Sequence, residues 1–209
     1  MAEEIRIGVL GIQGDVAEHV QASEAALIEM KQPGRLVIVK TPSQIDEIHG
    51  LIIPGGESTT IGRLSKDIRL LDKIAEAANT GMTILGTCAG AIILAKEVYD
   101  AKVGQTNQPI LGLMNMRVVR NAFGRQRESF EADADMPILE RNSFRGVFIR
   151  APAIEKVWPN ARPLANYENK IIAAQEGNLI ATVFHPELSG TTIFHQFVLR
   201  TILESPLAS

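Results

Sequence analysis

The sequence predicts an α/β fold with a mostly parallel central sheet and helices on its faces. Short runs rich in valine, isoleucine and leucine alternate with helical patterns through the first half. Glycine-rich turns follow several of these runs, as expected where strands lead into helices. With 209 residues and 45% hydrophobic content, the chain is long enough for one sizeable core. We therefore expect a single domain over residues 1–209.

Strand, turn and helix recur through the first half. The apolar run at residues 5–10 precedes a glycine-rich turn and an amphipathic pattern at 16–30, which Pro33 and Gly34 end. Two further units follow, and the last leads into a helix at 91–97. The expected elements, in order along the chain, are strands at residues 5–10, 36–39, 50–53 and 83–85, and helices at 16–30, from 58 onwards, 68–78 and 91–97.

The pattern changes in the second half. Residues 99–109 are polar and contain Gly104, Asn107 and Pro109, so we expect an exposed loop there. Beyond it, strand-like runs follow one another with few helices between them, which favours an antiparallel part of the sheet. These runs are at residues 116–119, 129–132, 147–149, 163–167, 171–175 and 179–184, and a last helix is expected at 192–203.

Composition and charge narrow the classes of function. The formal net charge is -3, without long acidic or basic runs, so we expect no surface for nucleic acid or an anionic membrane. No apolar stretch approaches the roughly 20 residues that cross a bilayer. Glu3 and Glu4 precede the first strand where a secretory leader would be basic. We expect a cytoplasmic protein that acts on a small molecule.

The single cysteine lies in the segment Gly86-Thr87-Cys88-Ala89-Gly90. This segment has the form of a nucleophile elbow, in which glycines permit a cramped strand-to-helix turn. The positive end of the following helix favours a thiolate, and the Ala89 N–H can face a developing oxyanion. A structural cysteine buried in a core turn fits the pentapeptide equally well. One cysteine excludes an internal disulfide, and no Cys/His cluster has metal-ligand spacing, so no metal is expected.

His185 and Glu187 are the base and acid that would support a cysteine nucleophile. Side chains two apart on extended chain share a face, so Glu187 can orient His185 while the imidazole takes the Cys88 proton. Taken singly, His185 is explained slightly better as a hydrogen-bonded histidine at a strand end, and Glu187 as a solvated charge. Because sites of open α/β sheets lie at the carboxyl ends of strands, we expect the three residues at one edge. The other histidines are expected to be structural or solvated: His19, His49 and His195.

A glycine pair and two arginines complete the candidate site. The loop at residues 54–58 follows a strand, and the backbone N–H of Gly56 can supply the second oxyanion donor. On its own, a Pro-Gly-Gly run is more often simply a turn. Arg120 and Arg150 end strand-like runs and can hold the α-carboxylate of an amino acid, although a solvated arginine is the default for either one.

With these residues in this order, the chain resembles class I glutamine amidotransferases, and more narrowly the glutaminase subunits of pyridoxal 5'-phosphate synthases. The elbow and the His-Pro-Glu segment are shared by the wider class. The narrower resemblance is carried by motifs that span nearly the whole chain, at residues 8–14, 54–60, 86–90, 120–126, 129–132, 146–152 and 184–188.

The resemblance implies a flavodoxin-like three-layer α/β/α sandwich, L-glutamine as substrate, and a triad of Cys88, His185 and Glu187. It implies glutamine contacts from Gly56, Glu57, Ser58, Arg120, Ile149 and Arg150. It also implies a partner: a (β/α)₈ synthase subunit that takes the ammonia and builds the vitamin B6 coenzyme, with no cofactor bound in the glutaminase. The loop at residues 100–109 looks longer than is usual for the family. The resemblance therefore does not predict the shape of the surface near the site, although it still predicts the chemistry.

Two rival functions remain open at this point. The chain can be a different enzyme on the same fold, such as a γ-glutamyl hydrolase or the glutaminase of another amidotransferase pathway. It can also be a noncatalytic binding subunit, which is disfavoured because all three triad candidates are present. Fold alone does not decide between these functions.

Overall fold

The computed structural model describes residues 4–122, 129–139 and 143–205. The centre of its sheet is wholly parallel, as predicted. Five strands lie in the order β2-β1-β3-β4-β13, each parallel to its neighbours. Their carboxyl ends therefore meet at one edge of the sheet. The bounds are β1 (Ile5–Leu10), β2 (Gly34–Val39), β3 (Gly50–Ile53), β4 (Thr83–Thr87) and β13 (Leu179–Thr182).

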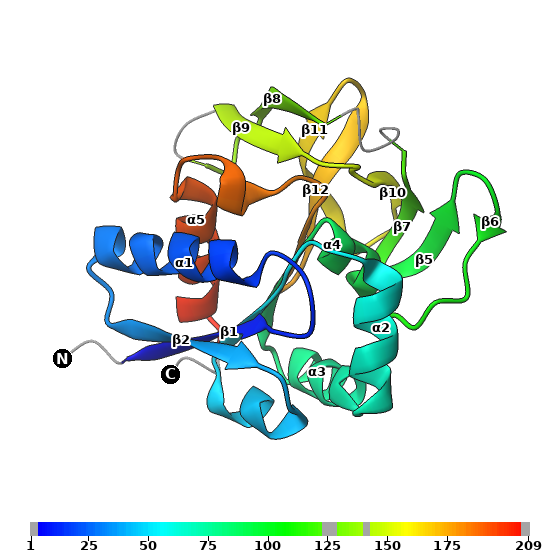
Figure 1. Cartoon of the computed structure of the whole chain (residues 1–209). Coiled ribbons are helices and arrows are strands. Elements are labelled where there is room, and N and C mark those ends of the chain that lie inside the picture. The colour runs from blue at the N-terminus through cyan, green and yellow to red at the C-terminus, as the bar shows by residue number, and fades with distance from the viewer. Residues whose placement is uncertain (1–3, 123–128, 140–142, 206–209) are drawn as a thin grey trace.

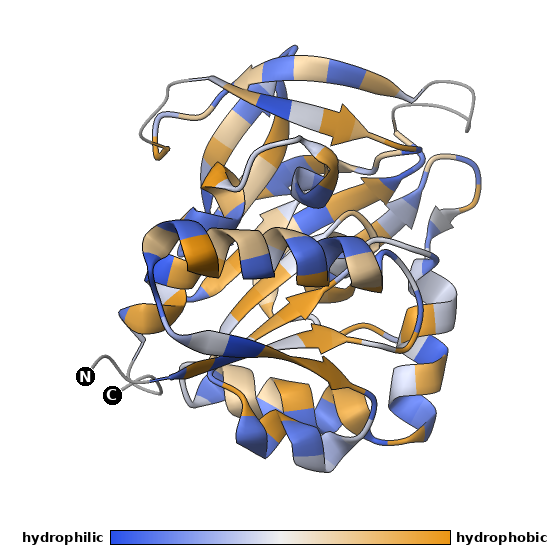
Figure 2. Cartoon of the chain, turned by 60° about the vertical axis from the view of Figure 1, so that its left-hand side comes forward, coloured by the Kyte–Doolittle hydropathy of each residue, from blue (hydrophilic) through white to orange (hydrophobic). Residues whose placement is uncertain are grey.

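Helices cover both faces of these strands, which confirms the three-layer prediction. α1 (Val16–Met30) and α5 (Ile193–Leu203) pack against each other on one face. α2 (Ser58–Asp67), α3 (Leu70–Asn79) and α4 (Ala89–Leu94) lie on the other (Figure 1). Figure 2 shows mainly hydrophobic strands between helices that carry hydrophilic residues along their length, which is the pattern of amphipathic helices around a buried sheet. Two short 3₁₀ helices, η1 (Pro42–Glu47) and η3 (Pro186–Leu188), complete the helical elements described.

Antiparallel strands extend the sheet beyond β13, as the second half of the sequence predicted. β12 (Lys170–Glu176) runs antiparallel to β13, and β10 (Ala153–Val157) and β7 (Met114–Arg120) continue the sheet. β11 (Arg162–Tyr167), β8 (Phe130–Asp135) and β9 (Ser143–Phe148) form a branch that starts at β12 and lies at the top of Figure 1. Phe144 of this branch packs against Phe184 and Phe194, which joins the branch to the main core.

Two expectations for residues 91–109 are wrong. The helix after the elbow ends at Leu94, and the chain passes directly into β5 (Ala95–Asp100), which pairs with β7. The alanine, lysine and glutamate at 95–97 favour a helix locally, but a neighbouring strand overrides such weak preferences. The expected loop likewise begins as a hairpin, because β6 (Gly104–Gln105) pairs back on β5.

One hydrophobic cluster includes buried residues of both the parallel and the antiparallel strands. It extends from Ile5 on β1 to Ile202 on α5 and includes Ile172 on β12. This continuity favours the expectation of one domain. In the described ranges, no helix is long and apolar enough to cross a membrane.

Candidate active site

Cys88 lies in the strained turn that the elbow motif predicted. It follows β4 directly and precedes α4, with φ 47° and ψ -98°. A non-glycine residue rarely adopts positive φ, and such strain is concentrated at functional sites. The flanking glycines are required by close packing: a Cβ on Gly86 would lie 2.6 Å from the carbonyl of Gly90, and one on Gly90 would collide with the carbonyl oxygen of Ile53. The turn therefore presents the thiol at the carboxyl end of the central strands.

His185 and Glu187 lie beside this thiol. The Nδ1 atom of His185 is 2.7 Å from Oε1 of Glu187, and His185 and Cys88 line the same cavity. The backbone N–H of His185 donates to the carbonyl of Val147 at 2.8 Å, which holds the residue against the end of β9. Cys88 is 8% exposed, His185 is 4% exposed and the Glu187 side chain is fully buried. The structure thus brings the three predicted residues into one chain of contacts, and their catalytic roles remain predictions.

Asp15 is a second carboxylate on the same histidine, and sequence reasoning missed it. Its Oδ2 atom lies 3.1 Å from His185 Nδ1. A side chain on Gly55 would collide with the imidazole and approach Asp15 Oδ2 to 2.7 Å, so glycine is required in this loop. The available signal was position: Asp15 ends the turn after β1, at the same edge of the sheet as the elbow.

Asp15, His185 and Glu187 also form a potential metal-binding group, since one ligand atom from each lies within 4.8 Å of the others. The distances of 2.7 and 3.1 Å from His185 Nδ1 to the two carboxylates are hydrogen-bond distances. A proton on Nδ1 therefore accounts for the arrangement, and we assign the group to proton chemistry.

The carboxylates control the charge of the imidazole. Burial opposes a charged ring, but hydrogen bonds to Asp15, Cys88 and Glu187 raise the pKa of His185 to about 12. Burial also raises the pKa of Glu187, although its hydrogen bond to His185 opposes that change. The pKa of Asp15 is lowered, chiefly by its hydrogen bond to His185. The site therefore favours an imidazolium, which can stabilise a thiolate at Cys88.

A cavity of about 440 Å³ opens beside the thiol, a size that suits a small polar molecule. All the residues with predicted substrate or oxyanion contacts line it: Gly56, Glu57, Ser58, Ala89, Arg120, Ile149 and Arg150. Cys88 and His185 line it as well, together with Gln13 and Asp15. Of the motif at residues 120–126, positions 123–126 lie outside the described residues.

Glu57 begins α2 and organises one wall of the cavity. Its Oε1 accepts from the Thr59 N–H at 3.2 Å, and its Oε2 accepts from the Thr60 N–H at 2.6 Å. Although burial opposes the charge, these hydrogen bonds lower the pKa of Glu57. Arg120 Nη2 is 3.6 Å from Glu57 Oε1, and the Gln13 side chain accepts from the Glu57 N–H at 2.8 Å. The wall therefore offers both an anion and a cation to a ligand.

Gln108 joins this wall from the segment that was expected to be an exposed loop. Its Nε2 donates to Ser58 Oγ at 3.1 Å, and its Oε1 accepts from Arg120 Nη1 at 2.9 Å. It is only partly exposed, whereas Asn107 beside it is exposed. Sequence reasoning missed Gln108 because the polar pattern of this segment predicts solvent exposure.

The sequence matches a known family over nearly its whole length. The model of the SNO glutamine amidotransferase family matches residues 9–204. The chain belongs to the SNO glutamine amidotransferase family. Two relatives of this chain are proteins named pyridoxal 5'-phosphate synthase subunit PdxT. The protein from Sulfurisphaera tokodaii is 49% identical over 94% of this chain and 98% of its own length. The one from Sulfolobus acidocaldarius is 47% identical over 95% of this chain and 99% of its own.

Solved structures agree with this assignment to the family. A crystal structure described as a glutamine amidotransferase is 37% identical, with a TM-score of 0.81, and the match covers 94% of this chain and 98% of that one. A second, described as a putative GMP synthase subunit from Thermoplasma acidophilum, has a TM-score of 0.62 over 98% of this chain and 94% of that one. It is 16% identical and shows the fold alone. The predicted family and fold class are confirmed.

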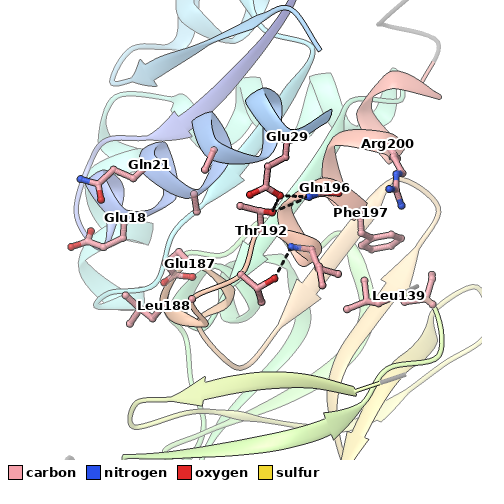
Figure 3. Close-up of a pocket in the computed structure, with 16 residues that line it drawn as sticks. Glu18, Gln21, Glu29, Leu139, Glu187, Leu188, Thr192, Gln196, Phe197 and Arg200 are labelled. Carbon is pink, nitrogen blue, oxygen red and sulfur yellow. Dashed lines mark hydrogen bonds between the residues drawn. The ribbon is translucent and has the colours of Figure 1, made fainter. Parts of the chain in front are cut away.

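A second cavity, larger than the one at Cys88, lies on the other side of Glu187, between α1 and α5 (Figure 3). It measures about 740 Å³ and has no cysteine or histidine in its lining. Glu29 at its wall accepts hydrogen bonds from Thr192 at 2.5 Å and from the Gln196 side chain at 2.7 Å, which ties α1 to α5. The smaller cavity contains Cys88 and His185, so it is the candidate active site.

Proposed function

We propose that this chain is the glutaminase subunit of a pyridoxal 5'-phosphate synthase and hydrolyses L-glutamine to L-glutamate and ammonia. The observation that carries the proposal is Cys88 in a strained elbow, in the same cavity as a buried His185 that Glu187 holds at 2.7 Å. The relatives named pyridoxal 5'-phosphate synthase subunits support it, as does membership of a glutamine amidotransferase family.

The first half of the reaction forms a thioester. The Cys88 thiolate attacks the side-chain carboxamide carbon of glutamine, and the negative charge moves to the carboxamide oxygen. The backbone N–H groups of Ala89 and Gly56 stabilise this oxyanion. The His185 imidazolium then gives its proton to the departing nitrogen, and the C–N bond breaks to release ammonia. Glu187 keeps the proton-carrying ring in place throughout.

The second half regenerates the Cys88 thiolate. Neutral His185 takes a proton from water, and the resulting hydroxide attacks the γ-glutamyl thioester. The second oxyanion breaks down to glutamate and the Cys88 thiolate. Arg120 and Arg150 are the cations available for the α-carboxylate of glutamine, and Glu57 is an anion available for its α-amino group. Ser58 and Ile149 complete the lining.

The ammonia passes to a partner. The partner is a (β/α)₈ synthase subunit, which uses the nitrogen to build the coenzyme, and the two chains form a hetero-oligomeric complex in the cytoplasm. The cavity opens at the carboxyl ends of the parallel strands, beside the turn that holds Cys88. This is the surface that such a partner would cover. We therefore expect weak glutaminase activity for the isolated chain and a higher rate with the partner bound.

The test measures glutamate formed from glutamine with and without a synthase subunit from the same organism. Wild type with partner is expected to be active, Cys88→Ala inactive, and Glu187→Gln slowed, because the amide keeps the shape but loses the charge. Glu24→Gln, an exposed acid on α1 that lines neither cavity beside Glu187, is the matched control. An electrophilic glutamine analogue should add mass to the chain once, since Cys88 is its only cysteine. Native turnover by Cys88→Ala, or hydrolysis of γ-glutamyl peptides in preference to glutamine, would refute the proposal.

A further inference from the structure

Two buried imidazoles lie behind the triad, and the proposed reaction does not use them. His19 on α1 is 0% exposed and His195 on α5 is 1% exposed, so neither is solvated. Nδ1 of His19 is 3.3 Å from Nε2 of His195. The pair is therefore a hydrogen-bonded unit that connects the two helices on one face of the sheet.

His19 reaches the catalytic acid of the proposed triad. Its Nε2 atom is 3.3 Å from Oε2 of Glu187 and 3.0 Å from Oγ1 of Thr87, the residue before the nucleophile. The other oxygen of Glu187 is occupied by His185. In the described part of the chain, Oε2 makes no hydrogen bond of ordinary geometry, although the whole side chain is buried. A buried carboxylate oxygen without a donor is costly, so the neighbouring N–H of His19 matters to it.

Both imidazoles are neutral near neutral pH. Burial holds the pKa of His19 well below its usual 6.5, and nearby His195 and His185 lower it further. Burial lowers the pKa of His195 to about 4. Each ring therefore carries one proton, and the hydrogen-bond network decides on which nitrogen.

The network assigns one tautomer to each ring. Nδ1 of His195 is buried and has no partner among the described residues. A buried N–H without an acceptor is rarer than a buried acceptor without a donor, so the His195 proton is on Nε2. It is donated to Nδ1 of His19, which leaves the His19 proton on Nε2. That N–H faces Thr87 and Glu187.

We propose that His19 is a positioning residue for the glutaminase site, whose Nε2–H faces Oε2 of Glu187 and keeps Oε1 on His185, while His195 holds His19 in this tautomer. The inference rests on the proposed function. A neutral donor suits the task, because a second imidazolium would compete with His185 for the carboxylate. The contact to Thr87 ties the same N–H to the strand that carries the nucleophile.

The titratable and polar groups around Glu187 come from η3, the turn before α1, α1, α5 and β9. η3 itself follows His185, and the turn before α1 supplies Asp15, which reaches the same imidazole. α1 supplies His19 and α5 supplies His195 behind it. β9 contributes the Val147 carbonyl that holds the His185 backbone. On the outer side, Glu18 of α1 lines the cavity beside Glu187 (Figure 3).

The experiment compares His19→Leu with His19→Gln in the complex with the synthase. His19→Leu removes the donor at similar volume, so Glu187 should bind its proton more tightly. We expect kcat to fall about 10-fold with KM within about twofold, and the acid limb of kcat/KM to move up by about one pH unit. His19→Gln retains an N–H at a similar reach and should return both values towards wild type. A change confined to thermal stability, with a wild-type pH profile, would show that His19 is only structural.

Ser23→Ala is the matched control, because Ser23 is buried on the same helix and its hydroxyl has no partner among the described residues. Its pH profile should equal that of wild type. A tautomer measurement needs no activity: the ¹⁵N imidazole shifts should place the His195 proton on Nε2, and a proton on Nδ1 would overturn the inference. If wild-type complex makes no glutamate while the tautomers are as assigned, the proposed function fails and the contact network stands.

Discussion

Asp15 and His185 form a contact of 3.1 Å between Oδ2 and Nδ1, on the nitrogen that also faces Glu187 at 2.7 Å. One N–H therefore has two carboxylate neighbours. Only Glu187 is fully buried, whereas the Asp15 side chain is 38% exposed and lines the cavity at the nucleophile. The inner carboxylate is suited to orientation, and the outer one adds charge at the mouth of the site.

The pH dependence of the reaction should report Asp15. Because this carboxylate contributes to a His185 pKa of about 12, Asp15→Asn should lower that pKa and the imidazolium should be lost at lower pH. The alkaline limb of kcat/KM is therefore expected to move down by about one unit. Initial rates across the pH range, with Glu24→Gln as the control acid, would measure this. An unmoved alkaline limb would show that Asp15 does not hold the proton on His185.

Stability should fall on mild acidification because of His195. Its pKa is about 4 in the folded chain, below the 6.5 of an unperturbed histidine, so the unfolded chain binds the extra proton between these values. The stabilisation is complete above pH 6.5 and is lost as the pH falls towards 4, by up to about 3 kcal/mol. His195→Gln should lose less stability than wild type between pH 7 and 4.5 in urea unfolding. Parallel curves would contradict this.

Gly90→Ala should destabilise the elbow. Alanine is favoured over glycine inside a helix by about 1 kcal/mol, but here its methyl group would collide with the carbonyl oxygen of Ile53. We expect a net loss of about 1–3 kcal/mol and a fall in kcat, because β3 and the turn must separate. Ala91→Gly, the next position in α4, should cost about 1 kcal/mol and retain turnover per folded molecule. Denaturant unfolding measures the stability of the two variants, and initial rates measure their turnover. A Gly90→Ala protein more stable than wild type would contradict the packing argument.

Gln108→Ala should weaken substrate binding more than chemistry. Without Gln108, Arg120 and Ser58 each lose one hydrogen bond at the cavity wall, while the triad contacts are untouched. We expect KM for glutamine to rise about 5- to 10-fold with kcat within about twofold, which corresponds to roughly 1 kcal/mol of binding. The neighbouring exposed Asn107→Ala is the control. A fall in kcat at unchanged KM would mean that Gln108 acts on the reacting groups.

Local pattern was enough for much of this protein. The strands of the parallel region, the helices that follow the glycine turns, and the segment around Cys88 depend on residues close in sequence. Only pairing with β7 turned residues 95–97 from a helix into a strand, because the energy of a sheet comes from a neighbour that is distant along the chain. The hairpin at residues 99–105 pairs residues close in sequence, but its polar residues lack the apolar alternation that marks a strand.

The sequence by itself determined the family, the α/β fold class and the membership of Cys88, His185 and Glu187 in one candidate site, since motifs and their order carry that information. The tertiary structure alone decided which further groups contact these residues. Asp15 on His185, Gln108 on Arg120, and His19 beside Glu187 have no local signature. His19 and His195 are 176 positions apart and meet only because α1 and α5 pack on the same face of the sheet.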